Sequence, residues 1–235
     1  MAGRTERIDL APFRLQFPSM RFAILPALIL TGLLLAGCQT MEYAVKEKFG
    51  IHKRDILVAR VQDARQAQDA ARQQFASALE EFVALTGNTG GPLGERYATL
   101  AQQLERSETR ATAVRDRISE IERVARALFK EWRGELDAYN DASLRAASAR
   151  QLTTTEERYN ALVVVMHRAA AGMDPVLVRF RDQVLFLKHN LNAQVLAQLD
   201  SNHRQLQTEI GQLIAEMEVS IREADRFIAE LQPAE

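Results

Sequence analysis

The feature that most constrains this chain is a heptad repeat of core-type side chains between residues 57 and 85. Its positions alternate spacings of four and three, with one polar member: Leu57, Val61, Ala64, Gln68, Ala71, Phe75, Ala78, Phe82 and Leu85. Such a repeat over four heptads predicts a helix that packs along its whole length against other helices. Its many alanines predict a close approach between those helices.

The same spacing returns over residues 97–132 and 148–173, and again from 177 towards the end of the chain. The first two stripes predict helices near 43–86 and 94–138. At 1.5 Å per residue each would be about 65 Å long. Two helices of equal length around one short connection predict an antiparallel hairpin.

The expected breaks differ in strength. Residues 86–95, "TGNTGGPLGE", contain four glycines and a proline, which predicts a turn between helices. Residues 138–143, "AYNDAS", offer Asn140 and Asp141 as caps, so a turn or only a kink is expected there. Gly172, Asp174 and Pro175 in "AGMDP" predict a second firm break. Near residue 200 a stutter in the repeat indicates a kink or a break.

Composition agrees with these helices, since only 11 of 235 residues are glycine and 6 are proline. The sequence therefore predicts an all-α fold: an elongated antiparallel bundle of three to five long, coiled-coil-like helices after an N-terminal signal segment. The formal net charge of -1 gives the whole chain no bias towards nucleic acid.

The N-terminal segment contains 14 residues without a charge, "FAILPALILTGLLL", over 22–35. This run is short for a spanning helix, which needs about 20 apolar residues. It has the length of the apolar core of a secretory signal, with Arg21 as its positive flank. Met20 is a candidate for the true start of translation, and a signal with a long leading region is the alternative.

Cys38, the single cysteine of the chain, ends this segment. Residues 35–38, "LAGC", resemble the bacterial lipobox. That resemblance implies cleavage before Cys38, a lipid on its sulfur and an acylated amino terminus. A plain signal or a membrane span that happens to contain cysteine is the alternative. Gln39 follows in place of aspartate, which implies sorting to the outer membrane, with the mature chain facing the periplasm.

The chain is accordingly divided into a lipoprotein signal segment (1–37), a lipid-anchored juxtamembrane connection (38–55) and a helical bundle domain (56–235). Lys46, Lys48, Lys53 and Arg54 gather in the connection. Near an anionic bilayer each would add about 1 kcal/mol to binding, although a solvated helix start explains them as well. Without residues 1–37 the formal net charge is -3.

One stretch of the bundle differs from the rest, "QVLFLKHNLNAQ" at 183–194. Residues 184–187 are apolar all around the helix, so we expect this turn to be covered on more than one side. Lys188, His189, Asn190 and Asn192 follow at once and are our candidate partner surface. The alternative is that they form the polar margin of the most buried point of the bundle.

Catalytic and metal-binding patterns find no support in the sequence. No two of the four histidines show the i,i+4 spacing of a helical metal site, and the single cysteine, Cys38, is expected to carry the lipid. The glycine-rich stretch at 86–95 has Glu95 where a phosphate-binding loop requires lysine. We therefore expect no metal, no cofactor, no small-molecule substrate and no enzymatic activity.

Four segments resemble one family: 52–68 ("HKRDILVARVQDARQAQ"), 127–145 ("ALFKEWRGELDAYNDASLR"), 180–194 ("FRDQVLFLKHNLNAQ") and 216–228 ("EMEVSIREADRFI"). They are similar to the proteobacterial domain-of-unknown-function 2959 family, over nearly all of the mature chain. This resemblance implies no activity and carries over no catalytic residue.

Together these features predict a non-catalytic periplasmic lipoprotein that acts as a scaffold or adaptor of the cell envelope. Its expected partners are the membrane, through the lipid anchor, and either an envelope protein or a second copy of the chain. The alternative is a helical protein that binds or shapes a membrane surface, against which the net charge of -3 argues. An enzyme or ATPase is the third class.

Overall fold

The computed structural model describes residues 52–87, 92–189 and 193–232. Its elements are α2 (Lys53–Gly87), α3 (Leu93–Glu135), the short 3-10 helix η1 (Leu136–Ala138), α4 (Ala142–His189) and α5 (Ala193–Leu231). Within these residues the fold is all-α, which confirms the predicted class. The start of the first predicted helix, before residue 52, lies outside the described residues.

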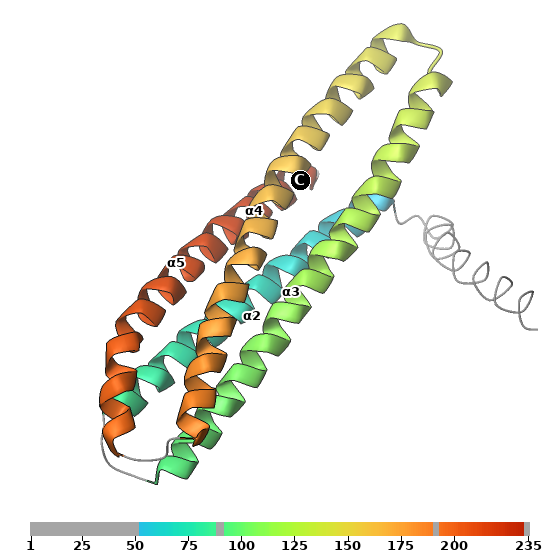
Figure 1. Ribbon diagram of the computed structural model, residues 1–235. Helices are drawn as coiled ribbons and strands as arrows, with labels where there is room; N and C mark the ends of the chain where they lie inside the picture. Colours follow the sequence, from blue (N-terminus) through green and yellow to red (C-terminus); the bar gives the residue numbers. More distant parts are fainter. Residues whose placement is uncertain (1–51, 88–91, 190–192, 233–235) are drawn as a thin grey trace, which may run out of the picture. The chain divides into compact units, whose positions relative to one another are not determined.

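The four long helices form an antiparallel bundle (Figure 1) in which each one packs against two others. Around the ring the order follows the chain: α2 contacts α3, α3 contacts α4, α4 contacts α5, and α5 returns to α2. Short connections between consecutive helices force this up-down-up-down topology. The end of α2, the start of α3, the end of α4 and the start of α5 therefore lie at one end of the bundle, and the α3–α4 connection lies at the other.

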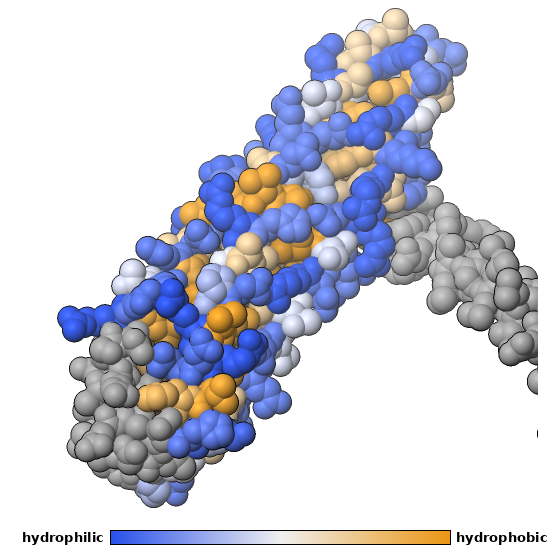
Figure 2. All heavy atoms as spheres, in the orientation of Figure 1, coloured by the Kyte–Doolittle hydropathy of each residue, from blue (hydrophilic) through white to orange (hydrophobic). Residues whose placement is uncertain are grey.

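The predicted heptad positions form the core. Every described member of the first stripe is buried, from Leu57 to Phe82. The side chain of Leu85, the last member of that stripe, lies outside what the structure describes. The other stripes meet the first in the same interior, where Phe82 packs edge-on against Phe180 with ring centroids 6.3 Å apart. Hydrophilic side chains cover most of the face of the bundle that Figure 2 shows. Burial of this one continuous seam is the main stabilising contribution to the fold.

Polar side chains interrupt the seam at one level. Gln68 of α2 and Ser220 of α5 are both fully buried, and the Ser220 hydroxyl donates a hydrogen bond of 2.9 Å to Gln68 Oε1. Gln68 Nε2 is buried without a partner. A buried polar pair of this kind penalises other alignments of the two helices, because a shift would leave more polar atoms unpaired.

The α3–α4 hairpin extends past the other two helices (Figure 1). Lys53 at the start of α2 reaches Glu131 of α3, and Arg54 donates to the backbone oxygen of Leu231 at the end of α5. Of the described helices only α3 and α4 continue beyond that level, and we call residues 132–150 the two-helix tip. Trp132 Nε1 donates to Ser148 Oγ at 2.9 Å across it.

The turn within the two-helix tip is where Asn140 and Asp141 predicted one. Asp141 Oδ1 accepts hydrogen bonds from the backbone N–H groups of Ser143 (2.7 Å) and Leu144 (3.1 Å), which caps the first turn of α4. These bonds, and a third from the Ser143 hydroxyl, favour the ionised carboxylate and lower the pKa of Asp141.

The predicted firm break at Gly172–Pro175 is wrong, because α4 runs without interruption to His189. Pro175 lies on an exposed face, while Met173, Val176 and Leu177 beside it are buried and hold the helix in the bundle. A kink near residue 200 is not seen either, since α5 is continuous from Ala193. Instead, α4 ends at His189 and α5 begins at Ala193.

Candidate partner-binding surface

The residues predicted to carry function are only partly described. Cys38, Asn190 and Asn192 lie outside the described residues. Lys188 and His189 form the exposed last turn of α4. Basic side chains at this position interact favourably with the negative end of the helix dipole, so their presence there has a sufficient structural explanation.

The apolar turn just before them is not covered on every side. Val184 and Leu187 are buried in the bundle, whereas the side chain of Leu185 is 52% exposed and that of Phe186 is 36% exposed. The turn was expected to be covered on more than one side; α3 and α5 pack on its inner side, and its outer side is open to solvent. Leu185 and Phe186 belong to a surface that runs along the outside of α4.

That surface is a second stripe with heptad spacing on the same helix. Its apolar members, which we call the α4 stripe, are Val164, Ala171, Pro175, Val178 and Leu185, and all of them are exposed. Val164 (56%), Val178 (51%) and Leu185 are among the most exposed large apolar side chains of the described residues. Apolar patches line this side of the bundle between charged ones (Figure 2). A line of aliphatic side chains at this spacing is the surface onto which another helix packs.

Ion pairs to the neighbouring helices border the α4 stripe. On the α3 side His167 Nε2 lies 2.8 Å from Glu122 Oε1, and Asp174 pairs with Arg115. On the same side, Arg181 of α4 pairs with Glu108 of α3. On the α5 side Arg179 Nε lies 2.7 Å from Glu209 Oε2. These pairs tie the bordering charges to the bundle, which leaves the apolar line between them accessible.

Because α4 is apolar on two sides, it has the length and composition of a membrane-crossing helix, alone among the described helices. Core helices of soluble bundles pass the same test. Here the inner side of α4 packs against α3 and α5. The apolar side chains of α4 that this packing leaves exposed are those of the α4 stripe.

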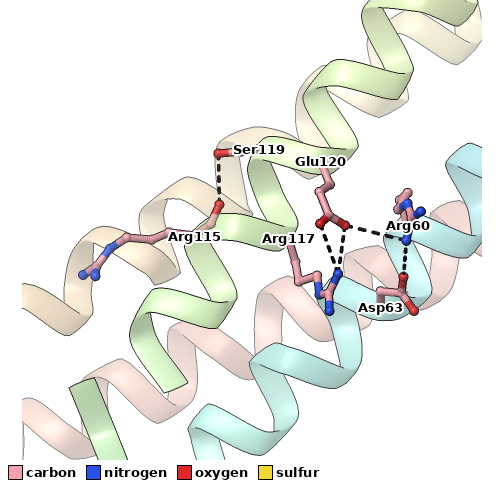
Figure 3. A network of polar contacts seen from close by, with 6 residues as sticks. All are labelled: Arg60, Asp63, Arg115, Arg117, Ser119 and Glu120. Atoms are coloured by element: carbon pink, nitrogen blue, oxygen red, sulfur yellow. Dashed lines mark hydrogen bonds and ion pairs between the residues drawn. The ribbon is translucent and has the colours of Figure 1, made fainter. Parts of the chain in front are cut away.

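Between α2 and α3, by contrast, the surface is covered by charged side chains that pair with one another (Figure 3). Arg60 Nη1 of α2 contacts Asp63 at 3.0 Å and Glu120 of α3 at 3.7 Å. Arg117 Nη1 donates to both oxygens of Glu120, which raises the pKa of Arg117. Such exposed pairs contribute little to stability, and this network joins α2 to α3 rather than forming a reactive site.

Concave and acidic features offer no comparable site. A hollow of about 590 Å³ is an open groove between Gln74 of α2 and a polar face of α3 that includes Glu105 and Arg106. In the part of the chain that the structure describes, no three histidine, cysteine, aspartate or glutamate side chains cluster closely enough to hold a metal ion.

A comparison with protein families decides where the chain belongs. The model of the family described as "protein of unknown function (DUF2959)" matches residues 42–231. The chain belongs to this family. The resemblance found in the four sequence segments is thereby confirmed, and the DUF2959 match includes all four long helices and the α4 stripe. No curated protein and no solved structure matches the chain significantly.

Sequence reasoning missed the α4 stripe although its signal is present. Val164, Ala171, Val178 and Leu185 recur at intervals of seven residues. The stronger core stripe of the same helix hides them, because one helix with two apolar faces gives a nearly continuous apolar run. The expected break at Pro175 also divided the α4 stripe in two.

Proposed function

We propose that this chain is a non-catalytic adaptor of the cell envelope that binds a helical protein partner through the α4 stripe. In this proposal Cys38 carries the lipid anchor, and the bundle faces the periplasm from the outer membrane. The observation that carries the proposal is the α4 stripe itself: an exposed, heptad-spaced aliphatic line bordered by charges that already have partners.

The two charges within the α4 stripe favour a protein partner over the bilayer. Arg168 and Asp182 interrupt the aliphatic line and are exposed. Their burial in lipid would be costly, whereas a protein partner can supply an opposite charge to each.

Site-specific crosslinking in intact cells tests this proposal. A photoreactive amino acid at Val178 should give a discrete adduct, because a partner helix packed on the α4 stripe would lie within reach. The same amino acid at Ser77, an exposed position on α2, is the matched control and should give little adduct. Equal, diffuse labelling at both positions would refute the adaptor proposal.

The anchor is tested separately. Cys38→Ser should leave an unprocessed precursor or release the chain from the membrane fraction, because the sulfur that accepts the lipid is absent. Gln39→Asp is the companion variant and should shift the chain from the outer to the inner membrane without changing processing. Unchanged fractionation of the Cys38→Ser chain would disprove the lipoprotein assignment.

A further inference from the structure

The two charges within the line of the α4 stripe differ from those at its borders. Arg168 and Asp182 continue the alternation of three and four residues between Val164 and Leu185, and both are exposed. Among the described residues neither forms an ion pair, whereas the bordering His167, Asp174 and Arg179 all do. As far as the structure describes the chain, the α4 stripe therefore carries one unpaired cation and one unpaired anion.

The spacing of these two charges is self-complementary. They are two heptads apart on one face of α4, about 21 Å along the helix, and Pro175 is midway between them. A two-fold axis at Pro175 would place Arg168 of each copy against Asp182 of the other. A parallel arrangement would instead bring like charges together at both positions, which is unfavourable.

The apolar side chains fit the same arrangement. About an axis at Pro175, Val164 of one copy faces Leu185 of the other, and Ala171 faces Val178. The positions nearest the axis, Ala171 and Pro175, have short side chains, which let two helices approach closely. Aliphatic residues thus meet aliphatic residues and each charge meets its opposite, as an isologous interface requires.

We propose that the occupant of the α4 stripe is a second copy of this chain, packed antiparallel about a two-fold axis near Pro175. This inference rests on the proposed function, since it names the partner of the same surface. Two lipid-anchored copies would then form one adaptor whose α4 helices are joined back to back.

Charge exchange tests the register with the full-length chain. Two differently tagged copies are produced together, solubilised from membranes and purified through one tag. Native copies should purify together. Arg168→Asp in both copies should weaken association about tenfold or more, because two like-charged contacts replace two attractive ones. Asp182→Arg in both copies should do the same.

The decisive experiment mixes two copies of the chain, each with one of the two substitutions. A copy with Arg168→Asp and a copy with Asp182→Arg should associate about as well as native copies, since both contacts are attractive again. Arg123→Asp, on the exposed face of α3, is the matched control and should change nothing. Circular dichroism of each variant verifies that the helices are retained.

The outcomes separate this inference from the proposed function. Recovery of association in the mixed pair supports the antiparallel dimer. Single variants that associate like native copies overturn it, even when native copies purify together. A Val178 adduct to a different protein, with no association between tagged copies, overturns the dimer and retains the adaptor. No adduct at Val178 and no association overturn both.

Discussion

The four-helix section and the two-helix tip are built from the same helices, α3 and α4, yet they differ in what covers them. In the four-helix section the stripes of these helices face α2 and α5 and are buried. In the two-helix tip every residue from Arg133 to Ala147 is exposed except the half-buried Leu136. A heptad helix therefore gains its stability from the partners that cover it rather than from its own sequence.

The largest expected difference between the two regions comes from aromatic truncation. Phe82→Ala removes a fully buried ring that packs against Phe180, and should lower the free energy of unfolding by about 3–5 kcal/mol. Tyr139→Ala in the two-helix tip should change it by less than about 0.5 kcal/mol, because this ring is 40% exposed. Urea titration measures both, and equal losses would contradict the comparison.

A smaller effect of opposite sign is expected at the buried polar level of the four-helix section. Gln68→Leu should raise the free energy of unfolding by about 1 kcal/mol, because Gln68 Nε2 is buried without a partner. The Ser220 hydroxyl can then donate to a backbone carbonyl one turn earlier. Gln66→Leu, on the exposed face of α2, is the control and should have little effect. A clear loss of stability would show that the polar pair is required for folding.

A hydrogen bond between Trp132 and Ser148 joins α3 to α4 at the junction between the two regions. Trp132→Phe removes the bond from Trp132 Nε1 to Ser148 Oγ and should destabilise the two-helix tip by about 1 kcal/mol. Faster amide exchange is expected in residues 132–150, with little change in the four-helix section. Ser148→Ala and the double variant complete a double-mutant cycle. A coupling energy near zero would argue that the bond does not hold the tip together.

The smallest expected effect is a pH dependence confined to the turn of the two-helix tip. The Ser143 hydroxyl, followed by the amides of Leu144 and Ser143, lowers the pKa of Asp141 below its ordinary value of 3.8. The stabilisation by this cap is therefore fully present above that value and is lost as the pH falls through the lowered pKa. NMR shifts of the Ser143 and Leu144 amides should report the transition. Asp141→Asn keeps an oxygen in place for capping and should abolish the titration.

The sequence anticipated the core more accurately than the connections. Gln68, Ser107 and Ser220 are buried although they are polar, because the heptad spacing places them on the inner face regardless of their chemistry. Pro175 was misjudged because a missing N–H usually ends a helix. Here the buried residues on both sides of it keep α4 continuous. The connection after His189 was missed because no glycine or proline marks it.

Of the two candidate functional features, the sequence predicts one, and the other is found only in the structure. The lipobox at Cys38 is a local pattern and can be recognised without a fold, whereas the α4 stripe becomes visible only once the partners of α4 are known. From the sequence alone, residues 184–187 are simply apolar. The bundle covers Val184 and Leu187 and leaves Leu185 exposed, because α3 and α5 together cover only the inner side of α4.

By itself, then, the sequence determined that this protein is made of long helices, which residues form their seam, and that Cys38 resembles a lipid attachment site. A periodicity of three and four residues is a property of one helix and needs no neighbours. The tertiary structure decided where α4 ends and which of its two apolar stripes remains exposed. These depend on how many helices surround α4, and no local pattern contains that number.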